Sequence, residues 1–357
     1  MRRHWQRAPL LVRAAWRGIV SPLSRDELFA LAASADVESR LVQRDGARWS
    51  VQHGPFARRS LPPLRRAQWS LLVQGVDLHS DVAHALLRPF RFVPDARLDD
   101  VMISFASDGG GVGPHTDAYD VFLLQLQGRR RWRVGPVRDA RPVPDAPLKL
   151  LRHFTPREEW VLEPGDLLYL PPQWGHDGVA IGPCMTASIG FRAPRAHELT
   201  RALMLEIADE TGERDDQSAL YSDRAGAATD APARIPSAMH AFALSSWRHA
   251  LRDPAALRRA LGRWLSEPKA RVWFEASAPA RTFGRRALRL DRRTRMLYDD
   301  HHIYINGESL RTSGRDAQCL RRLADARELT PADANRLSAQ ARDVVQQWLS
   351  SGWVHER

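Results

Sequence analysis

The stretch GPHTDAYDVFLLQLQGRRRWRVG, residues 113–135, joins a histidine and an aspartate two positions apart to an apolar run and three consecutive arginines. Residues i and i+2 of a β-strand face the same side, so the side chains of His115 and Asp117 should point together. A neutral imidazole and a carboxylate on one face supply two ligands for a divalent metal ion. The stretch therefore predicts strand structure with half of a metal site at its start.

A third ligand is available in LLYLPPQWGHDG, residues 167–178, where His176 follows an apolar strand and two prolines. Two histidines and one carboxylate on one face of an octahedron leave three positions open, as in non-haem Fe(II) oxygenases. Alone, an H-x-D pair is more often a surface or turn pair, and a single histidine a hydrogen-bonded loop residue. The Gly-rich approach at 109–113, the strand after the pair and the strand before His176 favour the metal site.

The arginines predict a second feature of the same interior. Alternation along RRRWRV places Arg130 on one face with Trp132 and Val134, which we expect to point inward. A buried guanidinium is costly unless it is paired, and no acid adjoins Arg130 in the sequence. Because a guanidinium binds a carboxylate through two parallel hydrogen bonds, Arg130 is expected to hold the far carboxylate of 2-oxoglutarate, with help from the Ser104 hydroxyl. The alternative partner is an internal Asp or Glu from another strand.

Patterning divides the chain into regions. Short apolar or alternating runs separated by Gly, Pro and Asp predict a β-sandwich or barrel in the first. Apolar residues at three- and four-residue spacing predict helices in the second, interrupted by a loop at 222–237. The third combines short strands, a hairpin turn at Asn306-Gly307 and one helix over 330–354 that begins at the cap Thr330. We therefore predict an α+β chain with domains at 1–195, 196–280 and 281–357, the last winged-helix-like.

Composition limits the class of protein. The net charge is +11, but of the 53 basic residues only Lys149 and Lys269 are lysines, and the arginines are spread along the chain. This permits weak contact with ribosomal RNA without indicating specific nucleic-acid recognition. Cys184 and Cys319 are the only cysteines, no apolar run could span a membrane, and no secretory signal is evident. We expect a cytoplasmic protein.

Three stretches, GGGVGPHTDAYDVFLLQLQGRRRWRVG, LEPGDLLYLPPQWGHDG and SIGFRAP, together resemble the bacterial ribosomal oxygenases of the JmjC type. The likeness continues in SRLVQRDGARWSVQHGPF and WSLLVQGVDLHSDVAHALLRPFRFVPDARLDDVMISF, and returns weakly in IYINGE. It implies a double-stranded β-helix (a jelly-roll or cupin variant) as the catalytic core, followed by a helical dimerisation region and a winged-helix domain. It also implies dependence on Fe(II), 2-oxoglutarate and O2, with His115, Asp117 and His176 as metal ligands and Arg130 and Ser104 at the co-substrate.

The activity that this resemblance implies is hydroxylation, by a homodimer, of the β-carbon of an arginine in the sixteenth protein of the large ribosomal subunit. Tyr119, Asp100 and Asp108 are candidates to hold that arginine, by proximity in sequence alone. One alternative keeps the chemistry and changes the target, to histidine hydroxylation or demethylation. Another makes the chain a regulator, with a ligand-sensing cupin and a DNA-binding winged helix. The last predicted helix carries acids among its arginines and no clear basic face, which disfavours the regulator.

Overall fold

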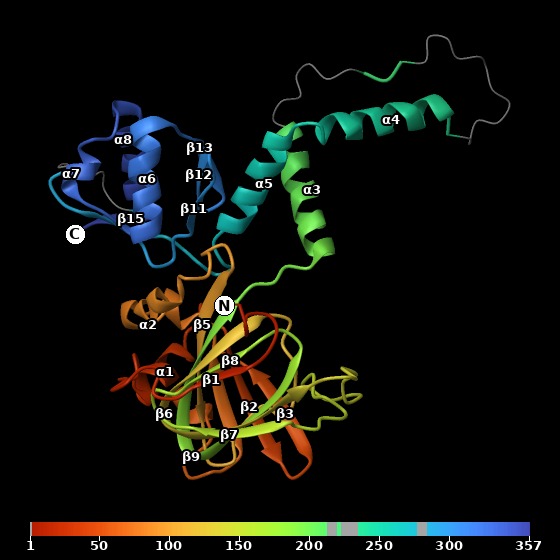
Figure 1. The fold of residues 1–357 in the computed structure, drawn as a ribbon, viewed down its shortest axis with the longest axis vertical. Helices are drawn as coiled ribbons and strands as arrows, with labels where there is room; N and C mark the ends of the chain where they lie inside the picture. Colours follow the sequence, from red (N-terminus) through yellow and green to blue (C-terminus); the bar gives the residue numbers. More distant parts are fainter. Residues whose placement is uncertain (1, 213–219, 223–234, 277–283) are drawn as a thin grey trace. The chain divides into compact units, whose positions relative to one another are not determined.

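The structure, a computed structural model, describes residues 2–212, 220–222, 235–276 and 284–357. The chain divides into two compact units, residues 1–193 with 270–273, and residues 194–269 with 274–357. The strands of the first unit wrap around a common interior (Figure 1). Its elements are β1 (Leu10–Val12), α1 (Arg25–Leu31), β2 (Ser39–Asp45), β3 (Arg48–His53), β4 (Trp69–Val73), α2 (Asp81–Ala85), β5 (Leu98–Ala106), β6 (Asp120–Pro136), β7 (Glu158–Leu162), β8 (Leu167–Leu170) and β9 (Trp174–Phe191), with 3-10 turns at Arg58–Ser60, Val76–Leu78 and Arg88–Phe90.

One nine-stranded sheet forms this unit, in the order β1-β8-β6-β9-β5-β4-β2-β3, with β7 paired to β6. The long strands β6 and β9 shift register between Gln125 and Arg129. Before the shift, β6 pairs with β8 and the second half of β9; beyond it, with β7 and the first half of β9. The two halves of the sheet face each other, because Arg130 beyond the shift donates hydrogen bonds to Ser104 and Thr186 on the other half. This is the predicted double-stranded β-helix.

Helix α1 covers the outside of the sheet. It begins after the N-cap Ser24, whose side chain accepts a hydrogen bond from the Glu27 amide while the Glu27 carboxylate accepts one from the Ser24 amide. Its Phe29 ring packs edge-on against Phe105, with a centroid separation of 5.3 Å, and 6.1 Å from Trp69. All three rings are buried, and they belong to the main apolar core, which lies on this outer face of the sheet.

The second unit is a winged-helix domain preceded by helices. Helix α5 packs against α3, where Arg263 pairs with Glu206 at 3.2 Å, and against the small sheet β11-β12-β13. The elements of the second unit are α3 (Ala196–Gly212), α4 (Ser237–Ala250), α5 (Pro254–Ser266), β10 (Leu288–Leu290), β11 (Met296–Tyr298), β12 (His302–Ile305), β13 (Glu308–Arg311), α6 (Gly314–Ala326), β14 (Glu328–Leu329), α7 (Pro331–Ala334), α8 (Ala339–Ser350) and β15 (Val354–Glu356).

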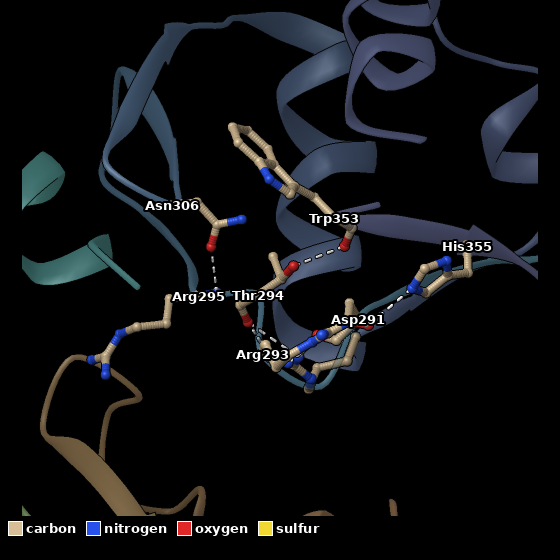
Figure 2. A network of polar contacts seen from close by, with 8 residues as sticks. Asp291, Arg293, Thr294, Arg295, Asn306, Trp353 and His355 are labelled. Carbon is tan, nitrogen blue, oxygen red and sulfur yellow. Dashed lines mark hydrogen bonds and ion pairs between the residues drawn. The ribbon is translucent and has the colours of Figure 1, made fainter. Parts of the chain in front are cut away.

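A polar network ties the turn after β10 to the C-terminal strand (Figure 2). The Asp291 carboxylate accepts hydrogen bonds from Arg293 Nε at 2.7 Å and pairs with His355 Nε2 at 2.9 Å. The Thr294 hydroxyl donates to the carbonyl of Trp353 at 2.8 Å. Asp291 is 5% exposed, and although burial alone would raise the pKa of its carboxyl, the bonds from Arg293 and His355 hold that pKa well below its usual range.

Of two local predictions for the second unit, one is confirmed and the other is wrong. The hairpin turn is confirmed, since Asn306 and Gly307 both have positive φ, 48° and 88°, between β12 and β13. The single helix over 330–354 is wrong, because the segment forms α7 and α8 with a break at Ser338. Ser338 caps α8 and donates to Asp316 on α6, a tertiary bond that competes with helix continuation. Most of the predicted loop at 222–237 lies outside the described residues.

Candidate metal and co-substrate site

Three side chains of the first unit meet at one point, and they are the predicted ones. The ligand atoms of His115, Asp117 and His176 all lie within 4.8 Å of one another, with His176 Nε2 3.5 Å and His115 Nε2 4.0 Å from the Asp117 carboxylate. His176 lies near the start of β9, whereas His115 and Asp117 lie on an extended segment outside the named strands. That segment is held by a bridge in which the amides of His115 and His176 each donate to the other's carbonyl, at 3.0 and 2.9 Å.

Backbone contacts orient both rings. The Nδ1 atom of His115 lies 2.9 Å from the Gly113 carbonyl, and Nδ1 of His176 lies 3.0 Å from the Trp174 carbonyl. A carbonyl oxygen only accepts, so each Nδ1 carries the hydrogen and each Nε2 presents its lone pair toward Asp117. Such bonds fix the tautomer and the direction of metal-ligating histidines. The donor set therefore fits a divalent transition metal bound on one face, with open positions on the other.

Electrostatics keep this set ready to bind a cation. Burial, together with the neighbouring His176, lowers the pKa of His115 to about 4, so its ring is neutral at pH 7. Burial opposes ionisation of Asp117, but its contacts with His176 and Tyr119 outweigh burial and hold the pKa of that carboxyl below its usual range. A neutral imidazole beside an ionised carboxylate is the form that a metal ion requires.

The three ligands line a cavity of about 460 Å³ between the two halves of the sheet. Arg130 and Ser104 line the same cavity, so all five predicted site residues lie together. The remaining walls come from β2, β4, β5, β6 and β9, from the segment that precedes β6 and from a loop after β6: Arg40, Val42, Ser70, Leu72, Met102, Val112, Thr116, Tyr119, Val121, Leu123, Trp132, Pro147, Leu148, Lys149, Leu150 and Ser188.

Arg130 is a buried cation that forms no ion pair with a carboxylate of the described residues. Its side chain is 4% exposed, and one guanidinium nitrogen donates to the Ser104 hydroxyl at 3.1 Å and to the Thr186 hydroxyl at 3.3 Å. Its Nε has no hydrogen-bond partner, and no carboxylate among the described residues forms an ion pair with it. The guanidinium also lies over the Trp132 ring, 5.2 Å from the centroid. The internal acid of the alternative interpretation is absent from the described part of the chain, and the geometry fits a bound carboxylate.

Thr186 is a site residue that the sequence analysis missed. It is 1% exposed and lies opposite Ser104 in the pairing of β5 with β9. Its hydroxyl donates a hydrogen bond to Gln125 Oε1 at 3.0 Å. The fully buried Gln125 donates in turn to the Gln127 carbonyl at 2.9 Å. The only signal in the sequence was a polar residue at an inward position of CMTASIGF, and threonine is common in strands for its β-branched shape alone.

The three residues suggested for substrate binding separate in the structure. Tyr119 lines the cavity, and burial with the charge of Asp117 raises the pKa of its hydroxyl. Asp100 is 2% exposed and does not line the cavity; it lies near Tyr119, since a Cβ placed on Gly190 would be 3.7 Å from Asp100 Oδ1 and 4.0 Å from the Tyr119 ring. Asp108 does not line the cavity; it is exposed, and its carboxylate accepts from the Gly182 amide at 2.8 Å.

Comparison with known proteins shows which families this chain resembles. The JmjC domain family matches residues 85–199, and the ROXA-like winged helix matches residues 249–355. The chain is 45% identical over 226 residues to ribosomal protein uL16 3-hydroxylase of Escherichia coli K12, covering 62% of this chain and 58% of that one. It is 37% identical over 204 residues to the probable ribosomal oxygenase of Haemophilus influenzae, covering 56% of this chain and 50% of the relative. The chain thus aligns with little more than half the length of these curated relatives.

The structural likeness extends further. The structure of YcfD, a ribosomal oxygenase from Escherichia coli, in complex with cobalt and 2-oxoglutarate superposes with a TM-score of 0.81 at 33% identity. That match covers 99% of this chain and 96% of the other, so it includes the β-helix, the helices and the winged helix together. With the barrel, the winged helix and the sequence all in agreement, this chain belongs to the JmjC-type ribosomal oxygenase family.

Proposed function

We propose that the protein is an Fe(II)- and 2-oxoglutarate-dependent oxygenase that hydroxylates the β-carbon of an arginine in uL16, the sixteenth protein of the large ribosomal subunit. The observation that carries the proposal is the combination of a two-histidine, one-carboxylate cluster and an anion-less buried arginine in one cavity. The names of the relatives, uL16 3-hydroxylase and ribosomal oxygenase, support the choice of target.

His115, Asp117 and His176 would hold the metal, and Arg130 with the Ser104 hydroxyl would hold the far carboxylate of the co-substrate while Thr186 orients Arg130. When bound, Fe(II) couples the oxidative decarboxylation of 2-oxoglutarate by O2, which gives succinate and carbon dioxide, to insertion of one oxygen atom into a substrate C–H bond. The chain's own contribution is positioning. The Nδ1 bonds of the two histidines fix the open coordination positions, and burial of Arg130 excludes water from the co-substrate's far end.

Tyr119 is the proposed partner of the target arginine. Apart from Asp117, the walls of the cavity carry no carboxylate among the described residues. Tyr119 lines the cavity close to Asp117, so a guanidinium that enters past the metal would pack on its ring. Asp100 does not line the cavity, and its Oδ2 already accepts hydrogen bonds from Gln74 and from the Gly75 amide. The Asp108 carboxylate also lies outside the cavity.

We also propose that residues 196–280 form a dimerisation region between catalytic domain 1–195 and winged-helix domain 281–357. Helix α4 has no buried residue, and apolar side chains on α3 and α4 are between 42% and 58% exposed: Met204, Leu205, Met239, Leu244 and Trp247. A second copy of the chain would cover them. None of the described helices is both long and apolar enough to cross a membrane. Residence in the cytoplasm and weak contact with ribosomal RNA complete the proposal.

The test uses the purified protein with Fe(II), 2-oxoglutarate, air and a synthetic uL16 peptide. We expect a gain of one oxygen atom, located by fragmentation at the β-carbon of a single arginine, with one succinate formed per peptide modified. A gain on histidine, or the loss of a methyl group, would move the same chemistry to another target. DNA binding that persists after metal removal, with no turnover of any ribosomal peptide, would overturn the oxygenase and favour the regulator.

A further inference from the structure

A basic surface lies beside the cavity of the first unit. It is made of six exposed cations from three segments that are far apart in the sequence: Arg44 and Arg48 around the β2–β3 turn, Arg65 and Arg66 before β4, and Lys149 and Arg152 in the loop after β6. The sequence alone does not reveal this group, because arginines are spread along the chain and only folding brings the three segments together. We call these six residues the basic surface.

Backbone hydrogen bonds and side-chain packing join the three segments. The Arg44 amide donates to the Gln68 carbonyl at 2.9 Å, which places the β2–β3 turn next to the end of the segment that contains Arg66. The Trp49 ring of β3 and the Leu150 side chain of the loop both pack on Gly113, where a Cβ atom would lie 3.1 and 2.6 Å from them. The loop is also fixed to the metal-binding segment, since the Leu151 amide donates to the Pro114 carbonyl at 2.8 Å.

The charges of the basic surface are not neutralised by the protein. None of its six cations forms an ion pair with a carboxylate of the described residues, whereas Arg13, Arg97 and Arg133 of the same unit each pair with an aspartate. The three segments 44–48, 65–66 and 149–152 contain one acid, Asp45. Exposed like charges repel one another, so a group of six is expected to attract a polyanion and release its counterions when one binds.

The surface and the cavity share a wall. Lys149 and Leu150 line the cavity that holds the metal ligands, and Arg152 follows two residues after Leu150. Trp49 is half-buried, and the Arg44 guanidinium lies over its ring at 5.5 Å from the centroid. Arginine forks suited to phosphate oxygens, next to a partly exposed aromatic ring, are the features of a surface that binds nucleic acid.

We infer that the basic surface binds the phosphate backbone of RNA, and so holds the enzyme against a ribonucleoprotein while a target side chain enters the neighbouring cavity. The second half of this inference rests on the proposed function, whereas RNA binding by the surface does not. An acidic protein is the other class of polyanion that could bind there. RNA is favoured because the half-buried Trp49 ring beside the cations offers a surface on which a base can stack, and because a ribosomal protein is surrounded by RNA.

The test compares two double charge reversals in the full-length protein. R48E/R66E changes the basic surface without touching the cavity wall, and R17E/R88E makes the same change in net charge at two exposed arginines of other segments. Binding of a short single-stranded RNA of mixed sequence is measured as a function of salt. We expect R48E/R66E to weaken binding about tenfold or more and to reduce the slope of log K against log salt by about 1.4, because each phosphate contact contributes about 0.7.

The control R17E/R88E should bind RNA as the wild type does, and both variants should hydroxylate the free peptide at the wild-type rate. The milder pair R48Q/R66Q replaces R48E/R66E if thermal unfolding shows that the charge reversal disturbs the fold. Equal weakening in both double variants would overturn the inference in favour of a general effect of net charge. Tighter binding of polyglutamate than of RNA would overturn it in favour of an acidic protein. Failure of peptide hydroxylation in the wild type would refute the proposed reaction and leave the RNA result standing.

Discussion

Replacement of Arg130 by methionine separates the two roles of a buried cation, cofactor binding and protein stability. The substitution keeps the length and much of the volume of the side chain but removes the guanidinium that faces the cavity. A bidentate pair with a carboxylate comprises two charge-assisted hydrogen bonds of about 1.5–3 kcal/mol each. A loss of about 3–5 kcal/mol corresponds to a rise in the KM for 2-oxoglutarate of roughly 100- to 3,000-fold, at about 1.4 kcal/mol per decade.

The stability of the protein without co-substrate should change in the opposite sense. Arg130 donates to two neutral hydroxyls, its Nε has no partner, and no described carboxylate offsets its charge. Because a buried charge without an anion is costly, an apolar side chain of similar volume is expected to leave the melting temperature unchanged or to raise it. A variant that had merely lost its structure would show the reverse.

The assays are succinate release against 2-oxoglutarate concentration, and thermal unfolding in the absence of 2-oxoglutarate. Arg129→Met is the matched control, because Arg129 is exposed on the other face of the same strand and should change neither quantity. An unchanged KM in Arg130→Met would refute the anchor role. A large fall in the melting temperature would refute the claim that Arg130 lacks an internal anion.

Four further outcomes are expected. Asp117→Ala should abolish peptide hydroxylation and anaerobic Co(II) binding while the circular dichroism spectrum stays that of the wild type. Retained turnover would refute the role of this cluster as the metal site. Gly178→Ala should destabilise the protein by about 1–3 kcal/mol in urea unfolding, because the new Cβ would lie 2.6 Å from the Trp132 ring, and an unchanged midpoint would show that the ring can move aside. The pKa of the Asp291 carboxyl is depressed in the folded protein, so this group stabilises the fold above its unfolded pKa of about 3.9, and the stabilisation is lost as the pH falls toward the folded pKa. Asp291→Asn should therefore lower the free energy of unfolding at pH 7 and make it depend less on pH in acid. Parallel pH profiles of the variant and the wild type would contradict this. Trp247→Glu should convert a dimer into a monomer in sedimentation experiments. An unaltered sedimentation coefficient would show that a dimer interface, if one forms, does not depend on Trp247.

Local patterns in the sequence were enough to select five residues that lie together in the structure. Strand periodicity correctly places Arg130 inward, whereas His115 and Asp117 converge with His176 although they lie on a segment outside the named strands. Patterns also indicated a β-sandwich or barrel and a winged-helix-like domain, and the resemblance to a family made the barrel a double-stranded β-helix.

The features that the sequence did not predict depend on contacts between residues that are distant in the sequence. Thr186 reaches Arg130 only through the pairing of β5 with β9, and nothing near it in sequence specifies that register. The break between α7 and α8 depends on a hydrogen bond from Ser338 to Asp316 of another helix. Asp100 and Asp108 looked alike by distance along the chain, but one is at a buried strand position and the other in an exposed turn. In each case the deciding partner is distant in the sequence.

The continuity of β9 has a consequence for selectivity. This one strand carries His176 near its start and Thr186 past its bend, and β6, paired along it, carries Arg130. His176 and Arg130 are therefore held at a fixed spacing by the backbone hydrogen bonds of two paired strands. We expect this spacing to select co-substrates by length, so that a keto-diacid one methylene shorter or longer than 2-oxoglutarate binds more weakly.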